Sequence, residues 1–381
     1  MENKRGVSLY VHVPFCRSKC PYCAFYSFRP QFQEMERWAN CAAKELTTLS
    51  TTLPPRKKLT TVYFGGGTPS LLSCENWQVV LKAMESLPRD DTCEFTVEAN
   101  PESLTLEKLR LWRAYGVNRI SLGVQSLNDM ELKTLARPHT ASDALQALDM
   151  CIKQEVRVSA DLMFALPGQT LRSWHNSLRT LVHAGIEHIS IYQLTIEPES
   201  YWGRHTPQGL PDGYQMYRWA QYYLCRRGFC QYEIASFATY GQESRHNLAY
   251  WRRSDVYAVG PGAWGFVNGT RFAKIRDFST WATAVEQGID TLDYLENLRG
   301  AREASEAAVL ALRTSEGIDF RAFAERYGNG YLSQIIARLR ELPSQFLYWK
   351  GDGVALSARG MRVGNAIWSE LIDLEDEAEH E

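Results

Sequence analysis

The chain has 381 residues, enough for one large catalytic domain with an appendage or for two domains of ordinary size. Its 45% hydrophobic and 23% charged residues exclude a mostly disordered protein, and its net charge of −2 argues against a nucleic-acid binder. Nine cysteines, an odd count, and no apolar run long enough for a signal peptide or a membrane span argue against a secreted disulfide framework. We therefore expect a cytoplasmic protein whose membrane association is at most peripheral.

Short β-branched runs alternate with stretches of helical periodicity from residue 7 to about residue 235. The expected strands are the runs at residues 8–13, 60–65, 93–99, 118–124, 157–164 and 188–194. A helix is expected at residues 171–184, where apolar residues lie three or four positions apart and Gly185 follows as a stop signal. Repeated strand–helix units predict an α/β first domain, residues 1–235, built as an open doubly wound sheet or as an incomplete (β/α) barrel.

The remaining chain divides into two further regions. Residues 236–300 are rich in glycine and aromatic residues, and we expect them to extend the first domain. Residues 301–381 predict three helices, a hairpin at 346–357 and a helix through Arg362 and Ile367, an order typical of a winged helix. This region carries 9 Lys/Arg against 14 Asp/Glu, so an internal docking role is a better interpretation than DNA binding. It ends in an acidic run, residues 373–381, which is expected to be a solvated tail.

Three cysteines form a cluster directly after the first expected strand. Cys16, Cys20 and Cys23 have the spacing CxxxCxxC, which indicates a metal centre. A cubane iron–sulfur cluster takes one thiolate for each iron, so three thiolates leave one iron open for a substrate or cofactor. Zinc is the alternative and would take His12 as its fourth ligand, but a residue held in a strand is poorly placed to fold back onto the same ion. The other cysteines are expected to be buried small apolar side chains: Cys41, Cys74, Cys93, Cys151, Cys225 and Cys230.

The CxxxCxxC loop after an N-terminal strand resembles the radical S-adenosylmethionine (SAM) superfamily. The resemblance implies a partial (β/α)6 barrel, a 4Fe-4S cluster held by Cys16, Cys20 and Cys23, and SAM bound to the open iron. In that superfamily, an electron from the reduced cluster cleaves a carbon–sulfur bond of SAM and releases a 5′-deoxyadenosyl radical. The cofactor carries this chemistry, so the protein has to position it and exclude water.

Polar residues follow successive expected strands, where parallel strands place their ligand sites. A glycine run with a threonine, residues 65–68, ends the second strand, and glycines let a charged amino-acid group approach the backbone. Glu98 and Gln125 end the third and fourth strands. Arg137 could pair with a carboxylate, and Asp161 could accept from a ribose hydroxyl. By resemblance to the superfamily, the expected SAM site comprises Tyr10, Phe25, Gly66, Gly67, Thr68, Glu98, Gln125, Arg137 and Asp161.

Further strings place the resemblance within one branch of the superfamily. The chain is similar to the oxygen-independent coproporphyrinogen III oxidases and their relatives in VHVPFCRSKCPYCAF, FGGGTPSLL, VEANPES, RISLGVQS, DLMFALPGQT and GMRVGNAIWSEL. The oxidases carry a fourth cysteine where this chain has Phe25, and a long N-terminal extension where this chain enters its first strand at Val7. In both departures the chain resembles the HemW family of heme chaperones.

The string HNLAYW, residues 246–251, matches the HNxxYW motif that in the HemW family is tied to heme binding. Imidazole is a good axial ligand for heme iron, and aromatic rings stack on the macrocycle. The resemblance thus implies heme contacts from His246, as iron ligand, and from Tyr250 and Trp251. Without the resemblance, the residues alone favour a histidine held within an aromatic cluster. Relatives commonly carry a histidine where this chain has Trp264, so heme ligation here is expected to differ.

Two classes of function fit these features. The first is a heme-binding radical SAM protein, with or without SAM cleavage, that carries heme to hemoproteins such as respiratory ones. The second is a radical SAM enzyme, either a coproporphyrinogen III dehydrogenase or a class C methyltransferase that uses two SAM molecules. The missing fourth cysteine and the HNxxYW string favour the carrier, and a zinc scaffold is a distant third. The expected partners are heme, recipient hemoproteins, an electron donor and a second copy of the chain, without nucleic acid.

Overall fold

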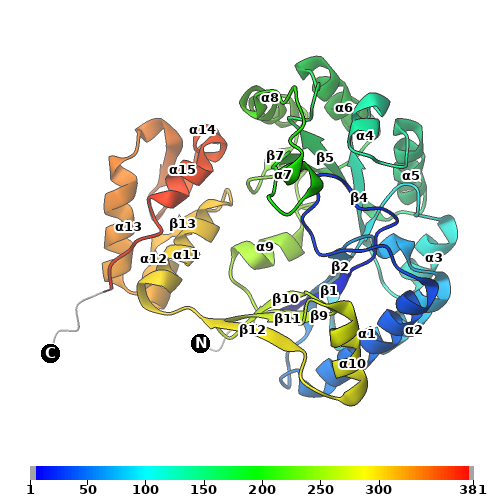
Figure 1. Ribbon diagram of the computed structural model, residues 1–381. Coiled ribbons are helices and arrows are strands. Elements are labelled where there is room, and N and C mark those ends of the chain that lie inside the picture. The colour runs from blue at the N-terminus through cyan, green and yellow to red at the C-terminus, as the bar shows by residue number, and fades with distance from the viewer. Residues whose placement is uncertain (1–5, 377–381) are drawn as a thin grey trace.

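A computed structural model describes residues 6–376, and a parallel sheet forms its centre (Figure 1). In this part of the chain the strands follow the order β12-β11-β10-β9-β1-β2-β3-β4-β5-β6-β8-β7. The parallel strands predicted from the sequence are β1 (Val7–Val13), β2 (Leu59–Gly66), β3 (Arg89–Ala99), β4 (Arg119–Gln125), β5 (Arg157–Phe164) and β6 (His188–Gln193). A doubly wound sheet reverses its strand order at a switch point, whereas β1 to β6 neighbour one another in chain order, so the partial barrel is confirmed.

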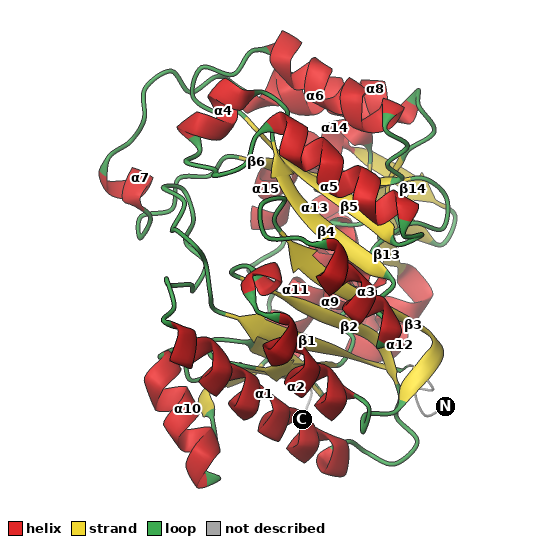
Figure 2. Ribbon diagram, turned by 90° about the vertical axis from the view of Figure 1, so that its right-hand side faces the viewer, coloured by secondary structure: helices red, strands yellow, loops and turns green. Residues whose placement is uncertain are grey.

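Helices cover the outer face of this sheet (Figure 2). They are α1 (Phe32–Thr52), α2 (Cys74–Met84), α3 (Leu106–Ala114), α5 (Ala141–Lys153), α6 (Leu171–His183) and α8 (Gly213–Cys225). Three short helices lie in the connections that follow β2, β4 and β6: the 3-10 helix η1 (Pro69–Leu71), α4 (Asp129–Thr134) and α7 (Tyr201–Arg204). Helix α6 matches the predicted segment: the Thr170 hydroxyl accepts from the Ser173 amide at its start, and Trp174 and Leu178 are buried on its inner face.

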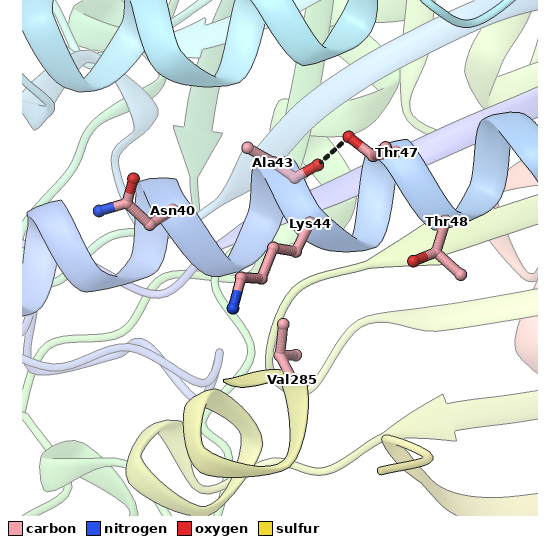
Figure 3. A pocket seen from close by; sticks show the side chains of 6 residues that line it. All are labelled: Asn40, Ala43, Lys44, Thr47, Thr48 and Val285. Carbon is pink, nitrogen blue, oxygen red and sulfur yellow. Dashed lines mark hydrogen bonds between the residues drawn. The ribbon is translucent and has the colours of Figure 1, made fainter. Parts of the chain in front are cut away.

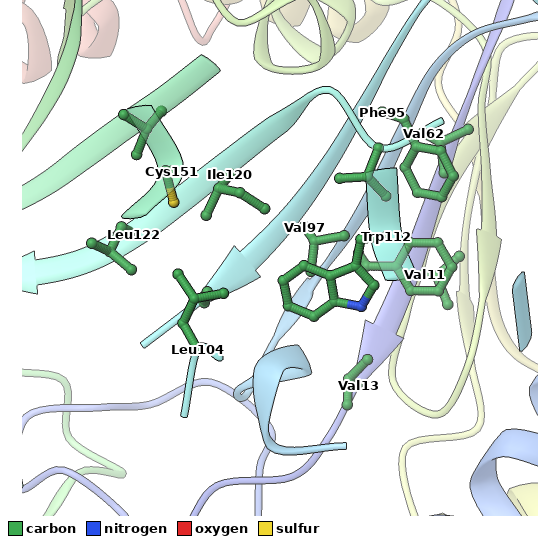
Figure 4. Packing of buried hydrophobic residues seen from close by; sticks show 14 of the residues in the cluster. Val11, Val13, Val62, Phe95, Val97, Leu104, Trp112, Ile120, Leu122 and Cys151 are labelled. Carbon is green, nitrogen blue, oxygen red and sulfur yellow. The ribbon is translucent and has the colours of Figure 1, made fainter. Parts of the chain in front are cut away.

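The two faces of the barrel sheet differ in chemistry. On the outer face, valines such as Val62 and Val97 pack with Trp112 under the helices, in the cluster that Figure 4 shows. On the inner face, alternate residues of the same strands are polar, as Tyr63 of β2 and Glu98 of β3 are. Closed (β/α)8 barrels fill their interior with branched apolar side chains, so this polar interior is suited to a polar ligand.

Residues 236–300, together with β7 (Cys230–Gln231), enlarge the barrel sheet at both ends. The elements are β8 (Ser236–Ala238), α9 (Arg245–Trp251), β9 (Val256–Val259), β10 (Trp264–Val267), β11 (Thr270–Lys274), α10 (Phe278–Gln287) and β12 (Leu292–Asn297). Strand β9 pairs parallel with β1, and β10 to β12 continue the sheet in antiparallel order. Helix α9 lies inside the curve of the sheet, between the barrel and the C-terminal region (Figure 1).

The C-terminal region has a hydrophobic cluster of its own. Its elements are α11 (Gly300–Leu312), β13 (Ile318–Asp319), α12 (Phe320–Tyr327), α13 (Asn329–Glu341), the 3-10 helix η2 (Ser344–Phe346), β14 (Leu347–Lys350), β15 (Gly353–Leu356), α14 (Ala358–Arg362) and α15 (Gly364–Ser369). The predicted hairpin is β14–β15, and the winged-helix assignment stays a prediction. The expected last helix is divided at Val363, whose φ of −120° and ψ of 22° depart from helical values.

Two further expectations need correction. Cys225 and Cys230 are exposed rather than buried, because they lie at the end of α8 and on the edge strand β7. Cys74, the first residue of α2, is only partly buried. The acidic tail starts later than expected: Leu374 is buried, and Asp376 accepts from the Ala301 amide at the start of α11 (2.7 Å). Residues 377–381 of the predicted tail lie outside the described residues. Between residues 6 and 376, no helix combines the length and the apolar character that crossing a bilayer requires.

Candidate functional site

The cysteine loop leaves the carboxyl end of β1 and returns to the point where it began. The Cys16 amide donates to Phe28 O (2.9 Å), and the Phe28 amide donates to Pro14 O (2.8 Å), which closes the loop at its base. The Lys19 ammonium donates to Phe25 O and braces the loop from within. The backbone thereby holds the three cysteine thiols on one short loop at the mouth of the barrel.

The three thiols are free and partly exposed, and two of them contact polar groups that follow neighbouring strands. The Thr68 hydroxyl donates to Cys16 Sγ (3.7 Å), and Arg137 Nη1 donates to Cys20 Sγ (3.7 Å). Burial raises the pKa of the Cys23 thiol, and the Lys19 ammonium opposes this. Adjacent cations favour the thiolate form that ligates iron, so this donor set fits a 4Fe-4S cluster.

His12 does not join the cysteines, as the zinc alternative would need. Its Nε2 donates to Tyr26 O (3.0 Å), and its Nδ1 accepts from the Tyr10 hydroxyl (2.9 Å). Burial lowers the pKa of His12 to about 4, so the ring is neutral and both nitrogens are engaged. Among residues 6–376, no three His, Cys, Asp or Glu side chains form a group that could hold a single metal ion.

The glycine run lies next to the cysteine loop and depends on its missing side chains. Gly66 has a φ of +111°, and a Cβ there would lie 2.4 Å from His12 Cε1. A Cβ on Gly67 would lie 2.5 Å from Phe15 O, a backbone atom. The Gly67 amide donates to Val13 O (2.8 Å), so the run is held against the end of β1. The packing of this strand end therefore requires glycine at both positions, independently of any ligand.

Glu98 links the glycine run to the barrel interior. Its Oε2 accepts from the Gly66 amide (3.0 Å), and its Oε1 accepts from the Tyr63 hydroxyl (2.7 Å). Burial, with the nearby Asp161 carboxylate, raises the pKa of Glu98 to about 7. A carboxylate that is costly to ionise and lies beside the partly exposed Gly66 and Gly67 is suited to meet a positively charged ligand group.

Asn100 is a site residue that the sequence analysis missed. Its Nδ2 donates to the Thr68 hydroxyl (3.1 Å), and its Oδ1 accepts from Arg137 Nη2 (2.6 Å). Arg137 Nη2 also donates to Gly123 O (3.2 Å), so the arginine spans from the end of β4 to the cysteine loop. The signal available in the sequence was the polar residue two positions after Glu98, in VEANP.

Among the remaining expected SAM residues, Gln125 ends β4, whereas Tyr10 and Asp161 lie midway along β1 and β5 rather than at a strand end. Asp161 Oδ2 accepts from the Ser121 hydroxyl (2.9 Å), while its buried Oδ1 has no partner within residues 6–376. Gln125 has a φ of +63°, uncommon for a residue with a side chain and frequent at functional sites. Tyr10 points into the barrel toward His12, whereas Phe25 lies on the outer rim of the cysteine loop and is 71% exposed.

The HNxxYW motif forms α9 and places its histidine inside the barrel. His246 is 1% exposed; a hydrogen bond joins its Nδ1 to the Thr61 hydroxyl (2.8 Å), and its ring stacks on Tyr63 at 4.9 Å. Its Nε2 has no hydrogen-bond partner in the described chain. Burial lowers the pKa of His246 to about 3, so its imidazole stays in the neutral form that can ligate a metal.

The two aromatic residues of the motif point in different directions. Tyr250, one helical turn after His246, packs edge-on against it at 5.3 Å. Trp251 faces the C-terminal region instead, where the Arg313 guanidinium lies 4.6 Å from its ring. Trp264 is half exposed on β10, 5.4 Å from the ring of Tyr294 on β12. The structure therefore brings His246 and Tyr250 together but separates them from Trp251.

A surface hollow of about 600 Å³ lies apart from this site (Figure 3). It is lined by α1 residues, including Lys44, and by Val285 of α10, on the outer side of the barrel. It carries none of the chemistry gathered at the strand ends.

Comparisons with known proteins agree with this geometry. The chain matches the Radical SAM superfamily over residues 10–181. It is 33% identical to "Heme chaperone HemW" of Bacillus subtilis over 96% of this chain and 99% of the relative. It is also 33% identical to "Radical S-adenosyl methionine domain-containing protein 1, mitochondrial" of Danio rerio, over 97% and 85% of the two chains.

Among solved structures, the chain is similar to the coproporphyrinogen III oxidase HemN of Escherichia coli, described as a radical SAM enzyme. The TM-score is 0.84, and the alignment covers 97% of this chain and 90% of that one. At 18% identity, the likeness concerns the fold alone.

Proposed function

Because the chain belongs to the HemW family of radical SAM proteins, we propose that it is a heme chaperone that binds heme and passes it to hemoproteins. The observation that carries the proposal is the position of α9. This helix places the His246 imidazole inside the barrel, in its neutral form and with no hydrogen bond to Nε2 within the described residues. The cysteine and glycine loops follow the ends of strands of the same barrel.

Cys16, Cys20 and Cys23 are the residues that would hold the family's 4Fe-4S cluster. When bound and reduced, the cluster supplies the electron that cleaves SAM. We propose that the amide and carbonyl groups of residues 65–67 and the Glu98 carboxylate receive the amino-acid end of SAM, and that Arg137 pairs with its carboxylate. The unpartnered Asp161 Oδ1 is the proposed acceptor for a ribose hydroxyl.

For heme, we propose His246 as the iron contact and Tyr250 as a supporting ring. The free Nε2 lone pair and the neutral imidazole support this assignment. Trp251 is not part of the proposed heme contact, because it stacks on Arg313. Phe25, at the position of the oxidases' fourth cysteine, favours the chaperone over a coproporphyrinogen dehydrogenase that shares the fold.

The proposal includes an acidic electron-donor protein that docks over the cysteine loop. Arg17, Lys19 and Arg29 are exposed on this loop, and residues 16–30 contain no acidic residue. A surface of one charge sign accelerates encounter with an oppositely charged partner. We place the protein in the cytoplasm, since a reducing compartment suits nine cysteines that are all unpaired.

The proposal is tested by hemin titration of the anaerobically reconstituted protein, followed by visible absorbance. Wild type is expected to bind hemin stoichiometrically, and His246→Ala to bind at least about 10-fold more weakly because one iron ligand is lost. His175→Ala is the matched control: it removes a histidine from another aromatic cluster, against Trp219 on the outer side of the barrel. Equal hemin affinity in wild type and His246→Ala would remove His246 from the proposal.

A further inference from the structure

Tyr63 contacts both halves of the candidate site at once. Its ring stacks on the His246 imidazole, with centroids 4.9 Å apart and planes 19° from parallel. Its hydroxyl donates to Glu98 Oε1 (2.7 Å), and Glu98 Oε2 accepts from the Gly66 amide (3.0 Å). One side chain therefore joins the motif histidine to the glycine loop through two contacts.

Two neighbouring strands hold this connection rigidly. On the inner face of β2, the Thr61 hydroxyl is hydrogen-bonded to His246 Nδ1 (2.8 Å). Gly65 leaves room for the hydrogen bond between Tyr63 and Glu98, since a Cβ on Gly65 would lie 2.8 Å from both Tyr63 Cε1 and Glu98 Oε1. On the inner face of β3, Glu94 accepts from the His246 amide (3.0 Å), four residues before Glu98. Side chains two residues apart on a strand share one face, so both strands fix α9 and the glycine loop in the same frame.

We propose that Tyr63 is a positioning residue that couples occupancy of the glycine loop to the orientation of the His246 imidazole. This inference rests on the proposed function. A ligand that contacts the Gly66 loop or Glu98 changes the hydrogen bonding of the carboxylate, whose other oxygen is held by the Tyr63 hydroxyl. A change at the carboxylate shifts the Tyr63 ring, and the His246 ring that stacks on it shifts too. Binding of SAM therefore changes the affinity for heme, and binding of heme changes the affinity for SAM.

The experiment measures hemin affinity with and without SAM, on reconstituted protein whose cluster is kept oxidised so that SAM is not cleaved. We expect saturating SAM to change the wild-type hemin dissociation constant by about 5-fold or more, the lower end of common allosteric couplings. Hemin should change the SAM dissociation constant by the same factor, because coupling between two binding sites is reciprocal.

Tyr63→Phe isolates the hydroxyl, since it keeps the ring that stacks on His246 and removes the donor to Glu98. It should retain hemin binding in the absence of SAM and reduce the coupling to less than about 2-fold. Tyr63→Leu removes the ring as well and should also alter the visible spectrum of bound hemin. Tyr217→Phe is the control: it deletes a hydroxyl that donates to Ile234 O, and it should keep the wild-type coupling.

Each outcome decides one claim. If wild type binds hemin with an affinity that SAM does not change, the coupling is overturned and the chaperone proposal stands. If Tyr63→Phe keeps the full coupling, the role of its hydroxyl is overturned. If wild type does not bind hemin, the proposed function fails together with the inference built on it.

Discussion

Arg313 is predicted to stabilise the contact between α9 and the C-terminal region. Its guanidinium lies between two indole rings, with Cζ 4.6 Å from the Trp251 ring and 4.4 Å from the Trp368 ring. Burial lowers the pKa of Arg313, which indicates that the cation has lost much of its water, and the buried Glu233 carboxylate opposes that shift. Desolvated cation–π contacts contribute about 1–2 kcal/mol each, so the pair is worth about 2–4 kcal/mol.

The substitution Arg313→Met approximately keeps the volume of the side chain and removes its positive charge. We expect it to lower the free energy of unfolding by about 2–4 kcal/mol, measured by urea denaturation with tryptophan fluorescence. Arg313→Lys should recover only part of the loss, because an ammonium group lacks the flat surface that stacks on both rings. Arg340→Met, on the exposed side of α13, should leave the unfolding midpoint unchanged.

A change of less than about 0.5 kcal/mol in the free energy of unfolding of Arg313→Met, the range of ordinary surface substitutions, would contradict a stabilising cation–π pair at Arg313. Full recovery by lysine would also refute it, since charge alone would then account for the effect.

Two further predictions concern the mouth of the barrel. Gly66→Ala should weaken SAM binding in equilibrium dialysis by at least about 10-fold, because its Cβ meets His12 at 2.4 Å; Gly241→Ala, with positive φ but open space around it, should bind SAM normally. Glu98 has a pKa raised from 4.5 to about 7, so the folded state binds its proton more tightly, and wild-type stability should fall as pH rises from about 4.5 to 7. The free energy of unfolding of Glu98→Gln should not vary with pH in this way. Measured by urea unfolding, it should therefore rise by about 3 kcal/mol relative to that of wild type between pH 4.5 and pH 7. If the two proteins differ in this free energy by the same amount at pH 5 and at pH 8, the raised pKa of Glu98 is contradicted.

The strands of the barrel could be predicted from the sequence because their apolar residues alternate or run continuously between turn signals. The choice between a barrel and an open sheet could not, since strand order is not encoded in local periodicity. The sequence predicted the glycine run as a place where a ligand approaches the backbone, whereas the structure shows a different need for glycine: a Cβ on Gly66 or Gly67 would strike His12 or the backbone. Tyr63 was missed because a single polar residue carries no spacing signal, and only the pairing of β2 with β3 brings it to Glu98. Asn100 was missed although it follows Glu98 by two positions at the end of a strand.

The HNxxYW motif shows the same limit within one helix. The family resemblance implied that His246, Tyr250 and Trp251 would contact one ligand. Successive residues on a helix are rotated by about 100°, so Tyr250 follows His246 on one face while Trp251 turns toward Arg313. Inside the barrel, His246 is hydrogen-bonded to Thr61, which lies 185 residues earlier in the chain. No local sequence pattern could indicate this contact.

The central claim is that this chain binds heme in order to pass it on. The most direct measurement loads the reconstituted protein with one equivalent of hemin, adds an apo-hemoprotein of the b type, and follows the visible spectrum of each protein after rapid separation. We predict that hemin moves to the acceptor and that His246→Ala delivers little, because it retains little hemin. Hemin that stays on the wild-type chain, or that reaches the acceptor no faster from the chain than from an albumin carrier, would contradict the account.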